Sequence, residues 1–178
     1  MHLLLTGQPG VGKSTIIQKT LQTLQIHPCG FLTLAAPPQA DGSSTVHLFP
    51  TQDANYLSFQ IKNRIGLRSV NHVHTAYPET FDTLGVNILA KIHPPCILMD
   101  ELGFMEQEAH FFQQRVLELL QQNQIPVLGV IKPRSTPFLD QIRALPNIKI
   151  IEITPENREE KLPEVIAFMQ HQINKNHF

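Results

Sequence analysis

Residues 7–14 are Gly7-Gln8-Pro9-Gly10-Val11-Gly12-Lys13-Ser14, and this stretch decides the fold because it matches the pattern G-x-x-x-x-G-K-[ST]. Glycines at these places allow backbone turns that a Cβ atom would forbid, so successive N–H groups can converge on phosphate oxygens. The stretch follows an apolar segment and precedes a helical pattern, the context in which such a loop binds phosphate at a helix N-terminus. The motif therefore predicts a P-loop that binds a nucleoside triphosphate.

Two side chains of this motif have a predicted chemical role. The Lys13 ammonium is expected to bridge the β- and γ-phosphates, which makes it a candidate catalytic residue as well as a binding residue. Ser14 is short enough to offer its hydroxyl to Mg²⁺, the predicted cofactor, which spans the same two phosphates. The predicted nucleotide-binding residues are Gly7, Gln8, Pro9, Gly10, Val11, Gly12, Lys13, Ser14 and Thr15.

An apolar run at residues 96–99 ends in two adjacent carboxylates, Asp100 and Glu101. Open α/β sheets bind ligands at the carboxyl ends of their strands, so this pair resembles a Walker B element. Successive strand residues point to opposite faces, so if Asp100 faces the magnesium shell, Glu101 turns toward the place of an attacking water. The two acids can then have two different roles, whereas the alternative is a pair of solvated acids at a strand end.

Apolar clusters alternate with helical patterns along the chain. Strands are expected at residues 3–5, 31–35, 46–49, 97–99, 127–131 and 148–153, and several are continuous, as is typical of strands covered on both faces. Two apolar stripes have helical spacing, and Thr154-Pro155-Glu156 predicts the start of the last helix. The stripes are Phe112, Val116, Leu119 and Leu120, and Leu162, Val165, Ile166 and Met169.

This alternation predicts an α/β fold with three layers, in which helices cover both faces of a mostly parallel central sheet. Residues 36–44 are too few for a crossover helix, so they predict the loop of a small antiparallel hairpin. Residues 51–77 show neither the two-residue apolar alternation of a strand nor the 3.6-residue spacing of a helix, so no element is assigned there. No linker or repeat divides the chain, so residues 1–178 are expected to form a single domain.

Composition narrows the possible partners. The chain has 14 Lys and Arg residues against 15 Asp and Glu residues, so it lacks the basic field that a nucleic acid backbone requires. No apolar run approaches the roughly 18 residues of a membrane span. Cys29 and Cys96 each lie beside an apolar segment, which favours reduced, buried thiols over a disulfide. We expect a cytoplasmic protein that binds neither membrane nor nucleic acid, with an oligomeric state that no motif specifies.

Five segments of the chain occur in the order seen in the cancer-related (THEP-type) nucleoside-triphosphatases, and the chain resembles this family nearly end to end. The segments are Gly7 to Ser14, Gly30-Phe31-Leu32-Thr33, Phe81-Asp82-Thr83-Leu84-Gly85-Val86, Asp100-Glu101-Leu102-Gly103-Phe104-Met105-Glu106 and Thr154-Pro155-Glu156-Asn157-Arg158. The resemblance implies a P-loop NTPase of RecA-like or kinase-like fold that hydrolyses Mg-bound ATP, GTP and other triphosphates with little base preference.

The resemblance also distributes roles among the residues. It places phosphate binding on residues 7–14, magnesium on Ser14 and Asp100, and activation of water on Glu101. Asn157-Arg158 matches a paired Asn-Arg of the family near its last strand, so Arg158 is a candidate catalytic residue that could reach the nucleotide or its phosphates.

Three departures from the family pattern affect the expected rate. The loop at residues 36–46 has no arginine, Phe104 replaces a usual lysine, and His72-Val73-His74 replaces a Gly-Arg/Lys-Tyr segment. An arginine finger is worth about 10³ to 10⁵ in rate, and unassisted P-loop hydrolases turn over at roughly 10⁻⁴ to 10⁻² per second. The reduced positive charge near the γ-phosphate therefore predicts slow hydrolysis. Lys132, Arg134 and Arg158 are the remaining candidates to supply that charge.

Two other functions are compatible with the same motifs. A nucleotide, nucleoside or polynucleotide kinase would transfer the γ-phosphoryl group to a hydroxyl in a neighbouring pocket. Against a kinase, the sequence has no arginine-rich lid segment, and a glutamate directly after Asp100 suits the activation of water better. A regulatory switch would instead use its nucleotide state to change its affinity for a protein partner.

Overall fold

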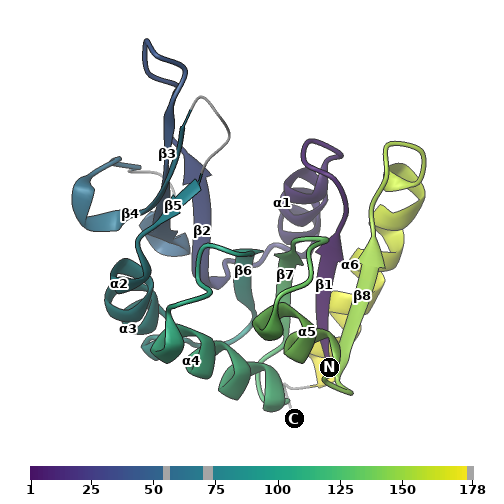
Figure 1. The fold of residues 1–178 in the computed structure, drawn as a ribbon. Helices are drawn as coiled ribbons and strands as arrows, with labels where there is room; N and C mark the ends of the chain where they lie inside the picture. The colour runs from purple at the N-terminus through teal and green to yellow at the C-terminus, as the bar shows by residue number, and fades with distance from the viewer. Residues whose placement is uncertain (54–56, 70–73, 176–178) are drawn as a thin grey trace.

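The computed structural model describes residues 1–53, 57–69 and 74–175. These residues form an eight-stranded sheet with the order β5-β4-β3-β2-β6-β7-β1-β8 and helices on both of its faces (Figure 1). The strands are β1 (His2–Thr6), β2 (Cys29–Ala35), β3 (Ser44–Pro50), β4 (Arg64–Arg68), β5 (His74–Ala76), β6 (Ile97–Leu102), β7 (Val127–Ile131) and β8 (Ile148–Glu152). The helices are α1 (Lys13–Leu24), α2 (Pro78–Thr80), α3 (Val86–Ala90), α4 (His110–Gln121), α5 (Pro137–Arg143) and α6 (Arg158–Lys175). Shorter helical segments are η1 (Thr51–Asp53), η2 (Ile61–Asn63) and the π-helical η3 (Phe81–Gly85).

The parallel part of the sheet consists of β2, β6, β7, β1 and β8. Because these strands run in one direction, their carboxyl ends lie along one edge, at the top of Figure 1. All the strands predicted from apolar clusters are present, and the predicted α/β fold with a mostly parallel sheet is confirmed. None of the helices within the described ranges combines the length and the apolar character that crossing a membrane requires.

The antiparallel part of the sheet is larger than the predicted hairpin. The hairpin of β2 and β3 is present, and β4 and β5 extend it with further antiparallel pairing. Both extra strands lie in the region 51–77 that the sequence did not assign. In β4, Ile65 is buried, but all three residues of β5 are exposed, so this edge carries no apolar run that could reveal a strand.

Two hydrophobic clusters lie on opposite faces of the sheet, because successive side chains of a strand alternate between them. Leu4 of β1 packs into the cluster beneath α3, α4 and α5, whereas Leu3 and Leu5 pack against α1 and α6. Met99 and Leu98 of β6 divide between the clusters in the same way. Strands buried on both faces need apolar side chains at every position, which is why their sequences are continuous apolar runs.

The predicted helix signals have clear structural counterparts. The stripe from Phe112 to Leu120 is buried on α4. In the last helix Val165 and Met169 are fully buried, while Leu162 packs at the edge of the core. The Thr154 hydroxyl accepts a hydrogen bond from the Asn157 N–H, and the Asn157 side chain accepts one from the Thr154 N–H. Two backbone N–H groups at the start of the last helix thereby gain hydrogen-bond acceptors.

β2 and β6 approach each other closely at the level of Gly30 and Leu98, which are register partners. Gly30 has a φ of 108°, and a Cβ atom there would collide with the carbonyl oxygen of Leu98. Cys29 and Cys96 lie beside this contact as free, buried thiols, as predicted. Only glycine therefore allows β2 to pair with β6 in this register.

Gly30→Ala should lower the free energy of unfolding by about 3 kcal/mol or more, because it adds a strained φ to a collision with main chain. Urea denaturation monitored by circular dichroism measures this loss. Gly42→Ala is the matched control, since Gly42 also has a positive φ, of 79°, but a Cβ there would meet nothing within 4 Å. Equal losses in the two variants would contradict the close-contact explanation.

Candidate functional site

The loop between β1 and α1 has the conformation that its glycines predict. Gly7, Gly10 and Gly12 have φ values of 133°, 81° and 103°, and Gly12 is the N-cap of α1. A Cβ at Gly7 would collide with the Ile153 carbonyl oxygen of the neighbouring chain segment. The loop therefore leads the main chain from β1 into the N-terminus of α1, where backbone N–H groups and the helix dipole favour an anion.

The Lys13 ammonium lies across this loop. Its Nζ donates hydrogen bonds to the carbonyl oxygens of Gly7, at 2.8 Å, and Gln8, at 2.7 Å. Burial lowers the pKa of Lys13, and the negative charges of Glu101 and Asp100 oppose that effect. The cation is thus held at the loop by two carbonyl groups and lies within the field of the two carboxylates.

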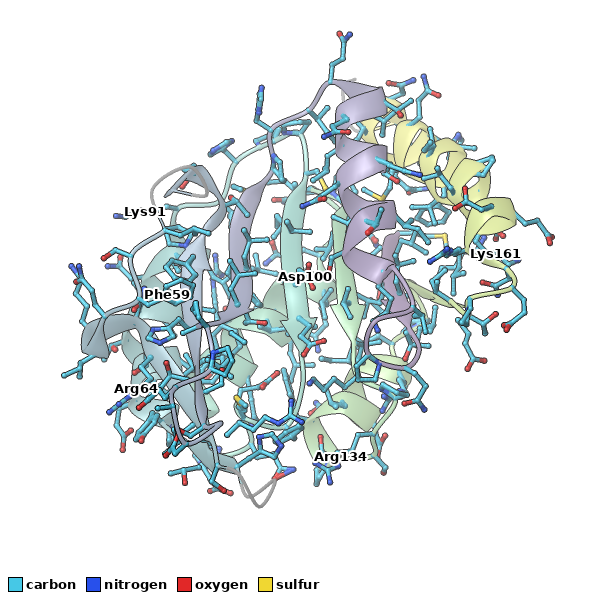
Figure 2. All side chains as sticks on the ribbon, turned by 90° about the horizontal axis from the view of Figure 1, so that it is seen from above. Phe59, Arg64, Lys91, Asp100, Arg134 and Lys161 are labelled. Carbon is cyan, nitrogen blue, oxygen red and sulfur yellow. The ribbon has the colours of Figure 1, made fainter. Side chains whose placement is uncertain are left out.

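Asp100 lies at the end of β6, next to the start of α1 (Figure 2). Its carboxylate accepts a hydrogen bond from the side chain of Ser14. The pKa of Asp100 is raised to about 6, chiefly by burial and also by the charge of Glu101, whereas the Ser14 contact and Lys13 act to lower it. The structure therefore brings together Ser14 and Asp100, the two predicted metal ligands.

Glu101 is held by two neighbours that lie far from it in the sequence. Its Oε1 is 2.7 Å from Nζ of Lys132, which directly follows β7. Its backbone N–H donates to Oγ1 of Thr33 in β2, at 3.2 Å. The Glu101 and Lys132 side chains are 31% and 33% exposed, so this ion pair is open to a ligand in solution. Nothing in the sequence linked Thr33 to Glu101, because only the pairing of β2 with β6 makes them neighbours.

Most of the predicted site residues line a hollow of about 370 Å³ at the carboxyl edge of the sheet. Backbone and side chains of the loop form one wall, and the carboxylates that end β6 form the other. Of the predicted nucleotide-binding residues, Gly7, Gln8 and Val11 do not line it, and Val11 packs into the core beside α1 and α6. The lining residues are Pro9, Gly10, Gly12, Lys13, Ser14, Thr15, Asp100, Glu101 and Val130.

The Phe104 ring contacts two cationic side chains. Its ring centroid lies 4.7 Å from the guanidinium carbon of Arg134 and 5.3 Å from Nζ of Lys132. The face of an aromatic ring attracts cations, so the ring helps to hold Lys132 beside Glu101 and also contacts Arg134. Phe104, at which the family resemblance led us to expect a lysine, thus carries no charge of its own but contacts two cations from the segment after β7. The predicted departure at His72 and Val73 lies outside the described residues.

Arg158 lies on the other side of the loop. It lines a separate hollow with Thr15 and Lys19, and a Cβ at Gly12 would be 3.6 Å from its Cδ. Gly12 and Thr15 line both hollows, so the two are neighbours across the start of α1. The structure thus places Arg158 beside the loop but does not bring it to the hollow that Glu101 lines.

Glu106 organises the loop that follows β6. The side chain is only 2% exposed, and its Oε1 accepts a hydrogen bond from the Gly103 N–H at 2.5 Å. Burial raises the pKa of Glu106 to about 7, against the lowering effect of that hydrogen bond. Glu106 was part of a motif in the sequence, but its burial beneath the Glu101 loop could not be read from the pattern.

Comparison with known proteins places this site in a family. The NTPase family matches residues 2–166 of the chain. Nucleoside-triphosphatase THEP1 of Aquifex aeolicus is 27% identical over 183 residues, which cover 96% of this chain and 99% of the relative. The cancer-related nucleoside-triphosphatase homolog of Mus musculus is 30% identical over 189 residues, which cover 95% and 96%. The crystal structure of THEP1 from Aquifex aeolicus shares the fold, with a TM-score of 0.71 at 24% identity over 96% of this chain and 99% of that one.

The raised pKa of Glu106 predicts that this carboxyl destabilises the protein at neutral pH. The unfolded chain loses the proton near pH 4.5 and the folded chain only near pH 7, so the contribution of Glu106 to the free energy of unfolding falls as the pH rises through this window. The difference between the two pKa values corresponds to about 3 kcal/mol. Glu106→Gln, which keeps the acceptor for Gly103, should therefore gain stability relative to wild type between pH 4.5 and 7.

Urea denaturation at several pH values tests this expectation. Glu108→Gln, at an exposed position of the same loop, should follow the wild-type curve. A constant difference between Glu106→Gln and wild type across the window would show that ionisation of Glu106 is not the cause.

Proposed function

We propose that this chain, which belongs to the NTPase family, hydrolyses the β–γ phosphoanhydride bond of ATP, GTP and other nucleoside triphosphates to a nucleoside diphosphate and phosphate. The observation that carries the proposal is the hollow in which Lys13, Asp100 and Glu101 face one another at the carboxyl edge of the sheet. A helix N-terminus and an ammonium group favour a polyphosphate, and a carboxylate beside them can accept a proton from water.

When a nucleotide binds, the Lys13 ammonium is expected to exchange its hydrogen-bond acceptors. Its Nζ now donates to the carbonyl oxygens of Gly7 and Gln8, and phosphate oxygens in the hollow would replace these acceptors. Hydrogen bonds between charged groups are stronger than those to neutral carbonyls, so the exchange favours the bound state. Except for Pro9, which has no N–H group, residues 7–15 would contribute their backbone N–H groups to the same phosphates.

The residues present are suited to a magnesium ion. The Ser14 hydroxyl and the Asp100 carboxylate are hard oxygen ligands that already contact each other at the wall of the hollow. Mg²⁺ typically takes one or two such protein groups and completes its shell with water and substrate phosphates. When bound, Mg²⁺ would neutralise negative charge on the β- and γ-phosphates. We propose Ser14 and Asp100 as its protein ligands.

Glu101 is the proposed base. Its Oε1 is held by Lys132, which leaves Oε2 to accept a hydrogen bond from a water molecule beside the γ-phosphate. The water oxygen attacks the γ-phosphorus, the bond to the β–γ bridging oxygen breaks, and Glu101 receives a proton from the water. Lys132, which contacts Glu101, lies close enough to this place to counter the negative charge that develops.

We propose slow turnover, in the range of roughly 10⁻⁴ to 10⁻² per second for P-loop hydrolases without a supplied arginine. Lys132 is already paired with Glu101, so it offers less charge to the transition state than a dedicated arginine would. For Arg158 we propose a contact with the part of the nucleotide that lies over Gly12 and Thr15, because it lines the hollow on that side of the loop.

We also propose that residues 1–178 act as one domain and that the protein works in the cytoplasm. Two observations support these proposals. Both hydrophobic clusters pack on the same sheet, and Cys29 and Cys96 are free thiols, which a reducing compartment maintains.

Glu101→Gln should reduce phosphate release by about 100-fold or more, because glutamine cannot accept the proton from water. Affinity for Mg-ATP should stay within about threefold of wild type, since the phosphate-binding loop is unchanged. Phosphate release is measured with a coupled assay and affinity by calorimetry, with Glu108→Gln as the matched control. Undiminished phosphate release in Glu101→Gln would remove this carboxylate from the reaction.

Lys13→Ala should weaken binding of Mg-ATP and Mg-GTP by about 10- to 100-fold, because hydrogen bonds from a charged group contribute about 1.5 to 3 kcal/mol each. Calorimetry measures this change. Lys91→Ala, at an exposed position after α3, should bind like wild type. Equal affinity of Lys13→Ala and Lys91→Ala would show that the loop does not bind the phosphates as proposed.

A further inference from the structure

A second cavity, of about 240 Å³, lies between the antiparallel part of the sheet and the loop that follows β6. An engineered cavity of about 150 Å³ is large enough for benzene, so this one can hold a single ring with substituents or a branched chain of similar size. Much of its wall is apolar and includes Val46, Ile65, Phe81 and Met105. It is suited to the body of a small organic molecule.

Close packing at β4 shapes this cavity. Gly66 of β4 faces Met105, and a Cβ at Gly66 would lie 2.7 Å from Sδ of Met105. Met105 therefore fills the space that a side chain at Gly66 would take. The buried Glu106 holds the same loop through its contact with Gly103. Two neighbouring residues thus fix the position of the cavity wall.

Glu101 joins this cavity to the hollow proposed to bind the phosphates, because it is a lining residue of both. Lys132, which pairs with Glu101, also lines the cavity. A molecule in the cavity would therefore reach the same carboxylate that faces the γ-phosphate of a nucleotide in the hollow. The arrangement puts a base between two binding spaces.

The charges around the cavity indicate the kind of molecule it takes. Arg68 and His74 line it and are register partners across β4 and β5. Lys132 balances the charge of Glu101. The Glu106 carboxyl at the wall accepts a hydrogen bond from the Gly103 N–H, and Arg68 contributes a guanidinium group. The side of the cavity formed by β4 and β5 thus favours a negatively charged group, while Glu101 offers an acceptor for a hydroxyl proton.

We propose that this cavity binds a second substrate, a small alcohol with an apolar ring or branched chain and a negatively charged group, which accepts the γ-phosphoryl group in place of water. The proposal rests on the proposed function, because the nucleotide in the neighbouring hollow is the phosphoryl donor. It makes the protein a phosphotransferase toward such alcohols and a hydrolase when the cavity holds only water.

The chemistry of the transfer is that of hydrolysis with a different nucleophile. The alcohol oxygen forms a bond to the γ-phosphorus, and the bond between that phosphorus and the β–γ bridging oxygen breaks. The electron pair of that bond stays on the nucleoside diphosphate, and Glu101 receives the hydroxyl proton. The products are a phosphate monoester and a nucleoside diphosphate, with no oxidant or reductant involved.

Binding is tested first, without nucleotide, on the full chain. The probe is 4-(hydroxymethyl)benzoate, which combines a ring, a hydroxyl group and a carboxylate, and it should bind with a dissociation constant of about 1 mM in ligand-observed NMR. Ala35 is an exposed residue that lines the cavity, and Ala35→Phe should fill it and weaken binding by about tenfold or more. Ala167→Phe, on the exposed face of α6, should bind the probe like wild type.

Transfer is tested second, with γ-labelled Mg-ATP and the same probe. Mass spectrometry should find the phosphate ester of 4-(hydroxymethyl)benzoate, and its yield should fall by about tenfold or more in both Ala35→Phe and Glu101→Gln. Benzyl alcohol, which lacks the carboxylate, should give less ester, and 4-methylbenzoate, which lacks the hydroxyl group, should give none. Thermal unfolding confirms that each variant is folded.

Three results would overturn the proposal. They are absence of probe binding at about 10 mM, equal binding by Ala35→Phe and Ala167→Phe, and free phosphate as the sole labelled product in the presence of bound probe. Phosphate release measured without any alcohol tells whether the second substrate alone is wrong or whether the proposed hydrolysis fails as well. If that release persists while no ester forms, hydrolysis stands and the second substrate is excluded.

Discussion

Parallel pairing of β6, β7 and β1 is the constraint on which the rest of this structure depends. These strands are buried on both faces, and their hydrogen bonding fixes where each one ends. The loop that follows β1 and the carboxylates that end β6 therefore leave the sheet at the same edge. The start of α1 and the acidic side chains of β6 lie across one hollow in the free protein, so a ligand that binds there would spend little energy on arranging them.

The polar side chains of the site form hydrogen bonds and an ion pair that a ligand can replace. Lys13 contacts carbonyl groups, Lys132 contacts Glu101, and Ser14 contacts Asp100. Each pair satisfies a polar group in the free protein, and each offers a partner that phosphate, water or metal can replace. The Phe104 ring supports this arrangement, because it contacts Lys132 and Arg134 without adding a charge of its own.

Glu101 connects the two spaces described for this molecule. Hydrolysis and transfer to an alcohol require the same acceptor for a proton, so one carboxylate can support both reactions. What differs is the nucleophile, and that depends on which molecule occupies the cavity formed by β2, β3, β4 and the loop after β6. The antiparallel extension of the sheet is thus the part of the fold that bears on the choice of nucleophile.

The sequence by itself determined the phosphate-binding loop, the strands of the parallel sheet and the carboxylates that end β6. These features are local: a short glycine pattern specifies the loop, and strands covered on both faces appear as continuous apolar runs. Only the tertiary structure decided that Lys132 pairs with Glu101, that Thr33 holds its backbone, and that Glu106 is buried beneath the adjoining loop. It also revealed β4, in which Ile65 is the buried apolar side chain, and β5, whose three residues are all exposed, so neither strand shows an apolar run. These features depend on contacts between segments that are distant in the sequence, and the residue pattern within one segment does not predict which other segment it will contact.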